Sequence, residues 1–521
     1  MLRLRPVGDR GVLLELPGLA EVLSVQAQLQ EEPVPGQVDV VAAACTVLVT
    51  VEDATQVGLL ADRLRAMDPT LPAEQEDALV TVEVQYDGAD LAEVARLTGL
   101  GETAVVAAHT ATPWVAAFGG FAPGFAYLTG GDPRLEVPRR DSPRTAVPAG
   151  SVALAGTFSA VYPRESPGGW QLIGHTNTVL WDTLRAEPAL IRPGHRVQFT
   201  AVRELIDLPQ RPFLPPASSG HAGLEVVEPG LYSTFQDLGR PGRMALGVAG
   251  AGALDRAAVR QANRLVGNPA GAAVIESLNG GLALRAVEDQ VLAVSGAVVE
   301  LVVGLPEGDE REVPLCAPFL LREGEVLRQS PPESGLRAYT AVRGGFDVEE
   351  ILGSRSTDSM SGVGPPPLAA GTGLAVGRPT AGSAVGEAET PPRTGSPTVL
   401  RVIPGPRDDW FGDGEFARLC SEDWTVTAQS NRIGLRLEGP ALGRSRQGEL
   451  PSEGTVRGAL QVPPSGLPVL FLADHPVTGG YPVIGVVVSA DLDRAAQLPP
   501  GSVVRFTGSG DVFRDPGSAG A

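Results

Sequence analysis

The stretch PGHRVQF at residues 193–199 recurs near the other end of the chain as PGSVVRF at residues 500–506. Two further blocks precede it in the same order in each half: VPAGSV (147–152) and PGGWQLIG (167–174) match VPPSGLPV (462–469) and TGGYPVIG (478–485). Three matching blocks in one order indicate an internal repeat. EGEVLR at 323–328 resembles a weaker third copy of the last block. We therefore predict two or three copies of one β-barrel-like unit, in which PGxxVxF is a turn entering a closing strand.

The rest of the sequence is organised around this repeat. With Gly 65, Pro 47 and only 5% aromatic residues, the composition favours many short strands joined by tight turns. We expect a mainly β fold with α+β elements, internally repeated. The predicted segments are a small N-terminal α/β module (1–85), a barrel domain (86–204), a linker (205–222), a second barrel part (223–361), an irregular Gly/Pro-rich connection (362–397), a third barrel part (398–512) and a tail (513–521).

Charge and composition exclude several classes of function. The formal net charge is -20, which repels nucleic acids and anionic membranes, so we expect neither as a partner. All 41 Lys+Arg residues are arginine, and without lysine the chain has no Walker A loop, no Schiff-base amine and no covalently bound biotin. The three cysteines and five histidines lack metal-ligand or disulfide spacing, so we expect no metal site. No signal peptide or membrane span is evident, which indicates a cytoplasmic protein.

Residues 121–128, FAPGFAYL, concentrate aromatic side chains around a Pro-Gly pair. Glycine permits a close approach of the backbone, and aromatic rings offer flat contact surface. Four arginines follow, at positions 134, 139, 140 and 144, and suggest an anion or carboxylate site. A hydrophobic hairpin with solvated charges explains the same residues equally well, so chemistry alone leaves both interpretations open.

Two other segments carry polar residues of interest. In GALDRAAVRQANRLVGNPAGAAVIE (252–276), Asp255 is placed to cap a helix that ends before Gly267. Asp90 and Glu93 have the spacing of a capping box for another helix. The segment 452–485 offers acid/base candidates, Asp474 or His475, beside the turn at residues 478–481.

Several motifs carry a resemblance to a known family. GFAPGFAYLTGGDPRLEVPRR, VPAGSVALAG and YPRESPGGWQLIGHT resemble the B subunit of 5-oxoprolinase, also called allophanate hydrolase subunit 1. STFQDLGRPGRMALGVAGAGALDRAAVRQANRLVGNP, YTAVRGGFDVEEILGSRST, NRIGLRL and SEGTVRGALQVPPSGLPV resemble the C subunit of 5-oxoprolinase, or allophanate hydrolase subunit 2. The resemblance spans nearly the whole chain and implies a fusion of these two proteins built from cyclophilin-like β-barrel domains.

The resemblance also implies an activity. This activity is the ATP-dependent opening of 5-oxo-L-proline to L-glutamate, with Mg accompanying the nucleotide. The implied partner is a separate barrel-fold A subunit. Assembly of the subunits into a higher oligomer is compatible with this activity. Related domains act in urea carboxylase, so an alternative is a carboxyltransferase component whose biotin carrier acts in trans. A further relative inhibits a sporulation histidine kinase, which gives a third hypothesis, a regulatory binding module. The family commonly has Arg where His175 stands, so an anion contact at that position is not expected here.

We expect the site in the cleft between the halves, where residues 121–127 face the turn at 474–481. The candidates for acid/base chemistry or Mg contact are Asp237, Asp255 and Asp474. Arg144 or Arg240 is the candidate for holding a carboxylate or phosphate. The full predicted set that binds substrate or nucleotide is Phe121, Pro123, Gly124, Phe125, Tyr127, Arg144, Gly150, Gln236, Arg240, Asn263, Gln461, Thr478, Gly479, Gly480 and Tyr481.

Overall fold

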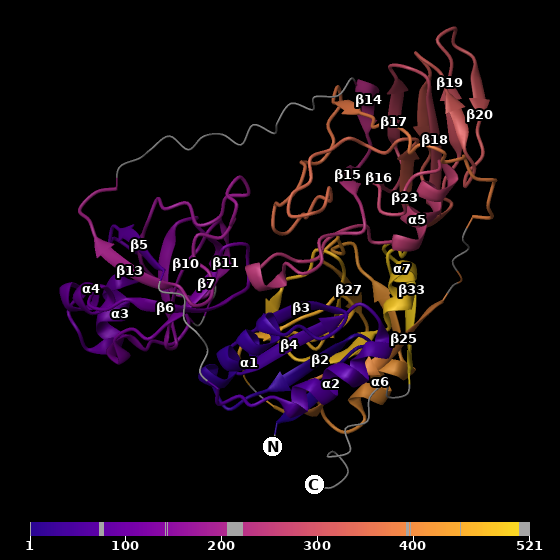
Figure 1. Ribbon diagram of the computed structural model, residues 1–521. Coiled ribbons are helices and arrows are strands. Elements are labelled where there is room, and N and C mark those ends of the chain that lie inside the picture. The colour runs from indigo at the N-terminus through magenta and orange to yellow at the C-terminus, as the bar shows by residue number, and fades with distance from the viewer. Residues whose placement is uncertain are drawn as a thin grey trace.

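The computed structural model describes residues 2–509 apart from 72–77, 141, 143, 206–221, 392–394, 396, 447 and 449. All but the first and last residues of the predicted linker (205–222), and the whole predicted tail (513–521), lie outside the described residues. The described part is mainly β, as the sequence predicts, and forms four modules (Figure 1). None of its helices is long and apolar enough to cross a membrane.

The N-terminal module is an antiparallel four-stranded sheet with helices on one face. Its elements are β1 (Arg3–Val7), β2 (Gly11–Glu15), β4 (Thr46–Val51) and β3 (Gln37–Ala42), in sheet order, with α1 (Leu19–Glu31) and α2 (Val57–Ala66). Successive side chains of a strand point to opposite faces. Val12 and Leu14 accordingly pack with the helices, whereas Leu13 packs against the C-terminal module. This sheet is therefore buried on both faces.

The second module is a seven-stranded sheet that almost closes into a barrel. Its strands, in sheet order, are β12 (Gln171–His175), β9 (Ser151–Ala155), β10 (Phe158–Val161), β7 (Ala126–Thr129), β6 (Trp114–Gly119), β13 (Arg196–Ala201) and β5 (Leu79–Val84). Gln85, which follows β5, and His175 exchange two backbone hydrogen bonds of 2.9 Å, so the two edge strands touch. Helices α3 (Leu91–Thr98) and α4 (Glu102–Thr110) and the ribbon β8 (Arg144–Val147)–β11 (Ser166–Gly168) complete this module.

The third module consists of two sheets around a shared apolar core. The six-stranded sheet runs β20 (Glu310–Glu312), β19 (Leu301–Gly304), β22 (Val326–Gln329), β17 (Leu282–Ala286), β14 (Ala222–Pro229) and β24 (Gly373–Ala375). The five-stranded sheet runs β15 (Tyr232–Gln236), β16 (Val274–Leu278), β23 (Ser334–Val342), β18 (Gln290–Val298) and β21 (Phe319–Leu321), with α5 (Arg256–Leu265) packed on it. The predicted connection 362–397 is largely irregular, but it contributes β24 to the first of these sheets.

The C-terminal module is a closed barrel. Its strands, in order, are β25 (Thr398–Pro404), β32 (Val483–Val487), β29 (Ala459–Gln461), β30 (Val469–Phe471), β27 (Gly434–Glu438), β26 (Asp423–Val426) and β33 (Val503–Gly508). The remaining elements are α6 (Glu415–Ser421), α7 (Leu492–Ala495) and the short pair β28 (Glu453–Gly454)–β31 (Thr478–Gly479). In Figure 1 the indigo N-terminal module lies beside this yellow barrel, and α7 lies next to α5.

The second and C-terminal modules share their closure, which confirms the repeat. The PGxxVxF blocks lie at β13 and β33, and each strand pairs in parallel with the first strand of its own sheet, β5 or β25. Trp114 and Trp424 are both fully buried, and each donates its indole N–H to a carbonyl five residues earlier, at 3.0 Å. The weaker copy of the block, EGEVLR at 323–328, ends in β22. Both neighbours of β22 in the described sheet, β17 and β19, are antiparallel, so this copy does not share the parallel closure.

Two sequence predictions need correction. The first module was expected to extend to residue 85, but β5 belongs to the second sheet because it pairs along its whole length with β13. Asp90 precedes α3 without capping it. Its carboxylate instead accepts hydrogen bonds from Arg140 (2.6 Å) and Arg144 (2.8 Å), and charged donors outcompete the backbone N–H groups of a helix.

Candidate functional site

The loop between β6 and β7 brings the first half of the chain against the C-terminal barrel. Phe121 has φ +63, a left-handed conformation that is unusual for a bulky residue and occurs often at functional sites. Its backbone N–H donates to Thr478 Oγ1 at 3.1 Å. The loop thus meets the turn at residues 474–481, as the sequence predicts.

The aromatic residues of this loop divide into two groups. Phe125 and Tyr127 are buried, with ring centroids 5.1 Å apart, and each also lies edge-on to Trp170. They belong to the core of the second module. Phe121 is only half-buried and stands beside Phe125 at 5.2 Å. Phe125 and Tyr127 therefore fill a core, as the hairpin interpretation predicts, while Phe121 forms a wall. Three of the four arginines expected to form an anion site are paired within the chain, Arg134 with Asp132 and both Arg140 and Arg144 with Asp90.

That wall bounds a small hollow where three modules meet, which we call the junction hollow. Its cavity volume is about 10 Å³, and its empty space is about 200 Å³ when the part open to solvent is included. Its lining comes from the second module (Phe121, Pro123, Arg164), the third module (Gly247, Ala249, Asp358, Met360, Ser361) and the barrel (His475, Pro476, Val477). Residues that are far apart in the two halves of the chain thus converge on one space.

The segment that carries Asp358 into the hollow is held by residues predicted as site residues. Asp237 accepts hydrogen bonds from the hydroxyls of Ser354 and Ser356, both at 2.6 Å, and from two backbone N–H groups. Arg240 is fully buried and donates to the Ser356 carbonyl. The side-chain amide of Gln236 donates to the carbonyl of residue 357 at 3.0 Å. In this arrangement Asp237, Gln236 and Arg240 shape the segment and do not line the hollow.

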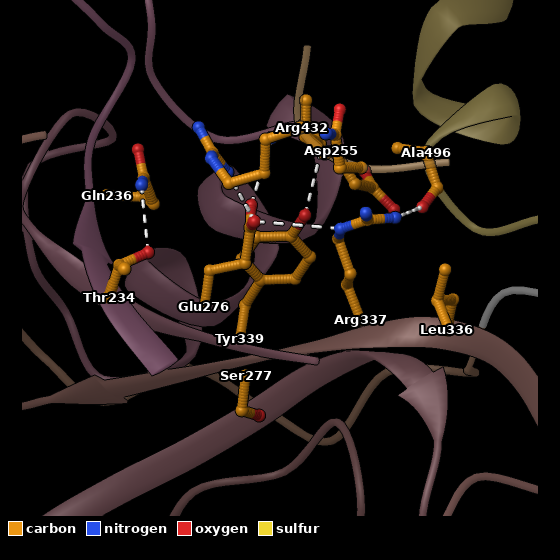
Figure 2. Close-up of polar contacts among 12 residues, drawn as sticks. Thr234, Gln236, Asp255, Glu276, Ser277, Leu336, Arg337, Tyr339, Arg432 and Ala496 are labelled. Atoms are coloured by element: carbon orange, nitrogen blue, oxygen red, sulfur yellow. Dashed lines mark hydrogen bonds and ion pairs between the residues drawn. The ribbon is translucent and has the colours of Figure 1, made fainter. Parts of the chain in front are cut away.

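Asp474 lies behind the hollow in a buried ionic network. Arg432 donates to both of its carboxylate oxygens at 3.0 Å. Another nitrogen of Arg432 reaches Glu276 of the third module, which also faces Arg337 (Figure 2). Ser359 adds its N–H (2.9 Å) and hydroxyl (2.6 Å) to Asp474. Burial alone would raise the pKa of Glu276, but the two arginines outweigh burial and lower it, so paired charges join the third module to the barrel.

Asp255 lies on the far side of this network. It caps α5 as predicted, accepting from the N–H of Ala258 at 2.9 Å, and also accepts from the Gln497 amide at 2.9 Å. Burial raises the pKa of Asp255 to about 6. Asn263 is buried on the same helix and donates to the Ala272 carbonyl at 2.8 Å. Neither residue lines the junction hollow.

A larger cleft opens near Asp255, between α5 and α7, with about 1040 Å³ of empty space. Of the charged groups that line it, Arg264 contacts Glu389 at 2.7 Å and Arg494 contacts Asp491 at 2.6 Å, whereas Asp255 forms no ion pair among the described residues. Asp493 accepts the first N–H groups of α5. All of its lining residues belong to the third module and the barrel, so the smaller hollow, which draws on both halves of the chain, is the better candidate site.

The remaining predicted residues have structural contacts of their own. Gly124 has φ +77, which L side chains rarely adopt, and an added Cβ would lie 3.1 Å from the Leu180 carbonyl oxygen, so glycine is strongly favoured there. Arg144 pairs with Asp90, and Gly150 sits in a turn, so neither lines the hollow. The turn itself is ordered by Gln461, which donates to the Tyr481 carbonyl at 3.2 Å.

The two glycines of that turn stabilise it through close packing and backbone hydrogen bonds. Gly479 pairs with Glu453 in the short β28–β31 ribbon, and a Cβ there would lie 2.6 Å from the Gln461 side-chain nitrogen. Gly480 accepts the N–H of Leu450 at 3.1 Å. Both positions therefore support the turn through their backbone.

Sequence reasoning missed three residues that the structure brings forward: Arg164, Asp358 and Arg432. Arg164 and Arg432 lie in motifs that carried the resemblance, YPRESPGGWQLIGHT and NRIGLRL, and Asp358 directly follows a third, YTAVRGGFDVEEILGSRST. Their importance rests on which partner each one has in space. The spacing of residues along the chain contains no such information.

His475 was a weaker candidate than Asp474, yet it lines the hollow. Its Nδ1 lies 2.9 Å from the Pro476 carbonyl oxygen, so Nδ1 carries the proton and donates. Burial lowers the pKa of His475 to about 4, and the ring is therefore neutral at pH 7. Arg164 is the cationic side chain among the described residues that line the hollow.

Comparison with known proteins matches both halves of the chain. The family models that match are described as "Carboxyltransferase domain, subdomain C and D" (residues 2–191) and "Carboxyltransferase domain, subdomain A and B" (residues 246–508). The 5-oxoprolinase C subunit of Escherichia coli K12 is 35% identical over 286 residues, which cover 54% of this chain and 90% of that protein. The 5-oxoprolinase B subunit of E. coli O157:H7 is 48% identical over 134 residues, covering 25% of this chain and 62% of that protein.

Two further matches are a larger enzyme and a solved structure. The urea amidolyase of Lachancea kluyveri is 33% identical over 310 residues, covering 54% of this chain but 17% of that protein. The crystal structure of TTHA0988 superposes with a TM-score of 0.84 at 36% identity, covering 96% of this chain and 100% of that one. The joined arrangement of all four modules thus has a counterpart in a solved structure.

Proposed function

Because the chain belongs to the family of carboxyltransferase-domain proteins that includes the B and C subunits of 5-oxoprolinase, we propose that it is a fused B and C component of a 5-oxoprolinase. Its reaction would be the ATP-dependent opening of 5-oxo-L-proline to L-glutamate, together with a separate A subunit. The observation that carries the proposal is the junction hollow, which takes its lining from both the B-like and the C-like half.

The chemistry of the reaction fits a divided machinery. A lactam is a poor electrophile, and phosphorylation of its oxygen creates a leaving group that makes ring opening accessible. The junction hollow is too small for a nucleotide with its triphosphate, base and ribose, and Arg164 is the one cationic side chain among its described lining residues. ATP with Mg stays a prediction of the family resemblance, and we assign it no residues in this hollow.

The test is an assay of the reconstituted system. The purified chain would be combined with the A subunit, 5-oxoproline and ATP, and glutamate and ADP would be measured. The proposal expects both products in equal amounts, with neither formed when either protein is left out. ADP without glutamate, or no product at all, would contradict it.

A second candidate is a carboxyltransferase component. The matched models are described as carboxyltransferase domains, and urea amidolyase is among the relatives. Since the chain contains no lysine, a biotin carrier would have to be supplied in trans. Carboxyl transfer from an added carboxybiotin carrier protein to urea, in the absence of glutamate formation, would favour this candidate over the first.

A further inference from the structure

The junction hollow contains two groups of opposite charge that the protein itself does not pair. Arg164 lies between β10 and β11 and is half-buried, and its Nε has no hydrogen-bond partner among the described residues. It reaches across to the third module, where a Cβ added at Gly362 would lie 3.6 Å from its Nη1. A buried guanidinium nitrogen without an acceptor is costly, so a ligand that accepts a hydrogen bond from it would be bound more tightly.

Asp358 presents the opposite charge from the other half of the chain. Within the described part of the chain, its carboxylate accepts hydrogen bonds only from its own segment, from the N–H groups of Met360 (2.9 Å) and Ser361 (3.0 Å) and from the Ser361 hydroxyl. No described arginine forms an ion pair with it, although Arg164 and Arg240 both act on it electrostatically. Burial and the nearby Asp474 raise the pKa of Asp358, as expected for a carboxylate held without a cation.

Several other buried carboxylates, by contrast, are paired with arginine. Asp474 has Arg432 at 3.0 Å and Glu276 shares the same arginine. Asp90 has two arginines within 2.8 Å. The fold therefore pairs these other buried carboxylates, and leaves Arg164 and Asp358 facing one space.

We propose that Arg164 and Asp358 are the two polar ends of a ligand site in the junction hollow, Arg164 binding a carboxylate and Asp358 accepting a hydrogen bond from an N–H group. Phe121, Pro123 and Val477 supply apolar walls for the middle of the ligand. The ligand class is a small, compact molecule that carries a carboxylate and an amide or amine N–H. This assignment rests on the proposed function for the choice of probe, 5-oxoproline, which has both groups on one five-membered ring.

The experiment separates the two ends with two probes. Isothermal titration calorimetry on the full chain would measure 5-oxoproline and 2-pyrrolidinone, which is the same ring without the carboxylate. Arg164→Gln is expected to weaken the binding of 5-oxoproline roughly 10- to 100-fold and to leave the affinity for 2-pyrrolidinone unchanged, because only the charge-assisted contact with the carboxylate is lost. Asp358→Asn is expected to weaken the binding of both probes, because both carry the ring N–H group from which Asp358 would accept a hydrogen bond.

Two variants guard against a loss of folding. Arg164→Lys keeps the positive charge and should recover part of the affinity lost in Arg164→Gln. Arg505→Gln removes an exposed arginine of the barrel, paired with Asp423, and should bind both probes as the parent does. Thermal melting of all variants would show that they are folded.

The outcomes are separable from the test of the proposed function. Turnover by the parent with unchanged affinity in Arg164→Gln and Asp358→Asn overturns this assignment and leaves the proposed function standing. Arg164-dependent binding without turnover supports the assignment and contradicts the proposed function. A parent chain that neither binds nor turns over 5-oxoproline contradicts both.

Discussion

The C-terminal barrel meets the N-terminal module and the junction hollow in two very different ways. At the N-terminal module, Leu13 and Leu48 pack against Phe471 and Val483 in a continuous apolar cluster. Charges at the rim of that contact have partners across it. Arg407 binds both Glu15 and Glu453, and Arg5 binds Glu15 (2.7 Å) and Asp409 (3.1 Å). This contact satisfies itself and needs no further component.

The junction hollow lies on the same barrel but is incomplete. Arg164 and Asp358 come from different halves of the chain and stay unpaired among the described residues, although the fold pairs Asp474 close by. Burying a charge without a partner costs free energy, so a protein retains such groups when a ligand supplies the partner. We therefore infer that Arg164 and Asp358, which line one hollow without pairing, mark the site, whereas the paired Asp474 nearby belongs to a structural contact.

The largest expected effect comes from breaking a paired network. Arg432→Met would leave Glu276 and Asp474 buried without their shared cation, and we expect it to lower the free energy of unfolding by about 3–5 kcal/mol. Chemical denaturation monitored by circular dichroism would measure it. A loss below about 1 kcal/mol would show that this network is not structural.

Phe125→Ala should rank next. Its ring is buried between Tyr127, Tyr162 and Trp170, and its removal should cost about 3–4 kcal/mol through lost contacts and a cavity. The matched change Phe121→Ala, at the half-buried wall, should cost less than half as much and should weaken 5-oxoproline binding instead. Equal losses of stability would remove the distinction between core and wall.

Asp255 should produce a pH-dependent effect. Its pKa is raised by burial from 3.8 to about 6, so between these values the folded protein keeps a proton that the unfolded chain has lost. Its stabilising contribution is present below about pH 4 and is lost as the pH rises through 6, by about 3 kcal/mol in all. The difference in unfolding free energy between the parent and Asp255→Asn should fall by about that amount from pH 4 to pH 7.

The buried histidines do not obscure that result. Burial lowers the pKa of His475 to about 4 and that of His109 to about 3, and both titrate in the parent and in the variant alike. Their contributions therefore cancel in the difference. A difference that does not change with pH would contradict the environment described for Asp255.

A smaller effect is expected at the N-terminal contact. Arg407→Gln removes the cation shared by Glu15 and Glu453, but Glu15 is partly exposed and can be solvated. We expect a loss of about 2 kcal/mol in the free energy of unfolding, with 5-oxoproline affinity unchanged. Reduced affinity without a stability loss would indicate that this contact also belongs to the site.

Much of the fold could be predicted from the sequence because its signals are local. The PGxxVxF blocks specified two equivalent closing strands, and Asp255 specified the start of α5. The capping box predicted at Asp90 was wrong. Local spacing identified Asp90 as a capping residue, but its carboxylate pairs with Arg140 and Arg144, which are distant in sequence.

The candidate site was only partly predictable. The meeting of Phe121 with the turn at Thr478 followed from the two aromatic and glycine-rich motifs. Asp237 and Arg240 looked functional because they are polar residues in a distinctive motif, yet they hold the segment that carries Asp358. The roles of Arg164 and Asp358 depend on the absence of partners, which becomes visible only when all neighbours are placed.

A crystal structure of the chain with 5-oxoproline bound would show whether the unpaired charges of the junction hollow form the site. We predict ligand density in the hollow, with the carboxylate on the Arg164 guanidinium and the ring N–H on the Asp358 carboxylate. Ligand bound in the larger cleft between α5 and α7, or in the hollow with Arg164 and Asp358 both turned away from it, would overturn this assignment.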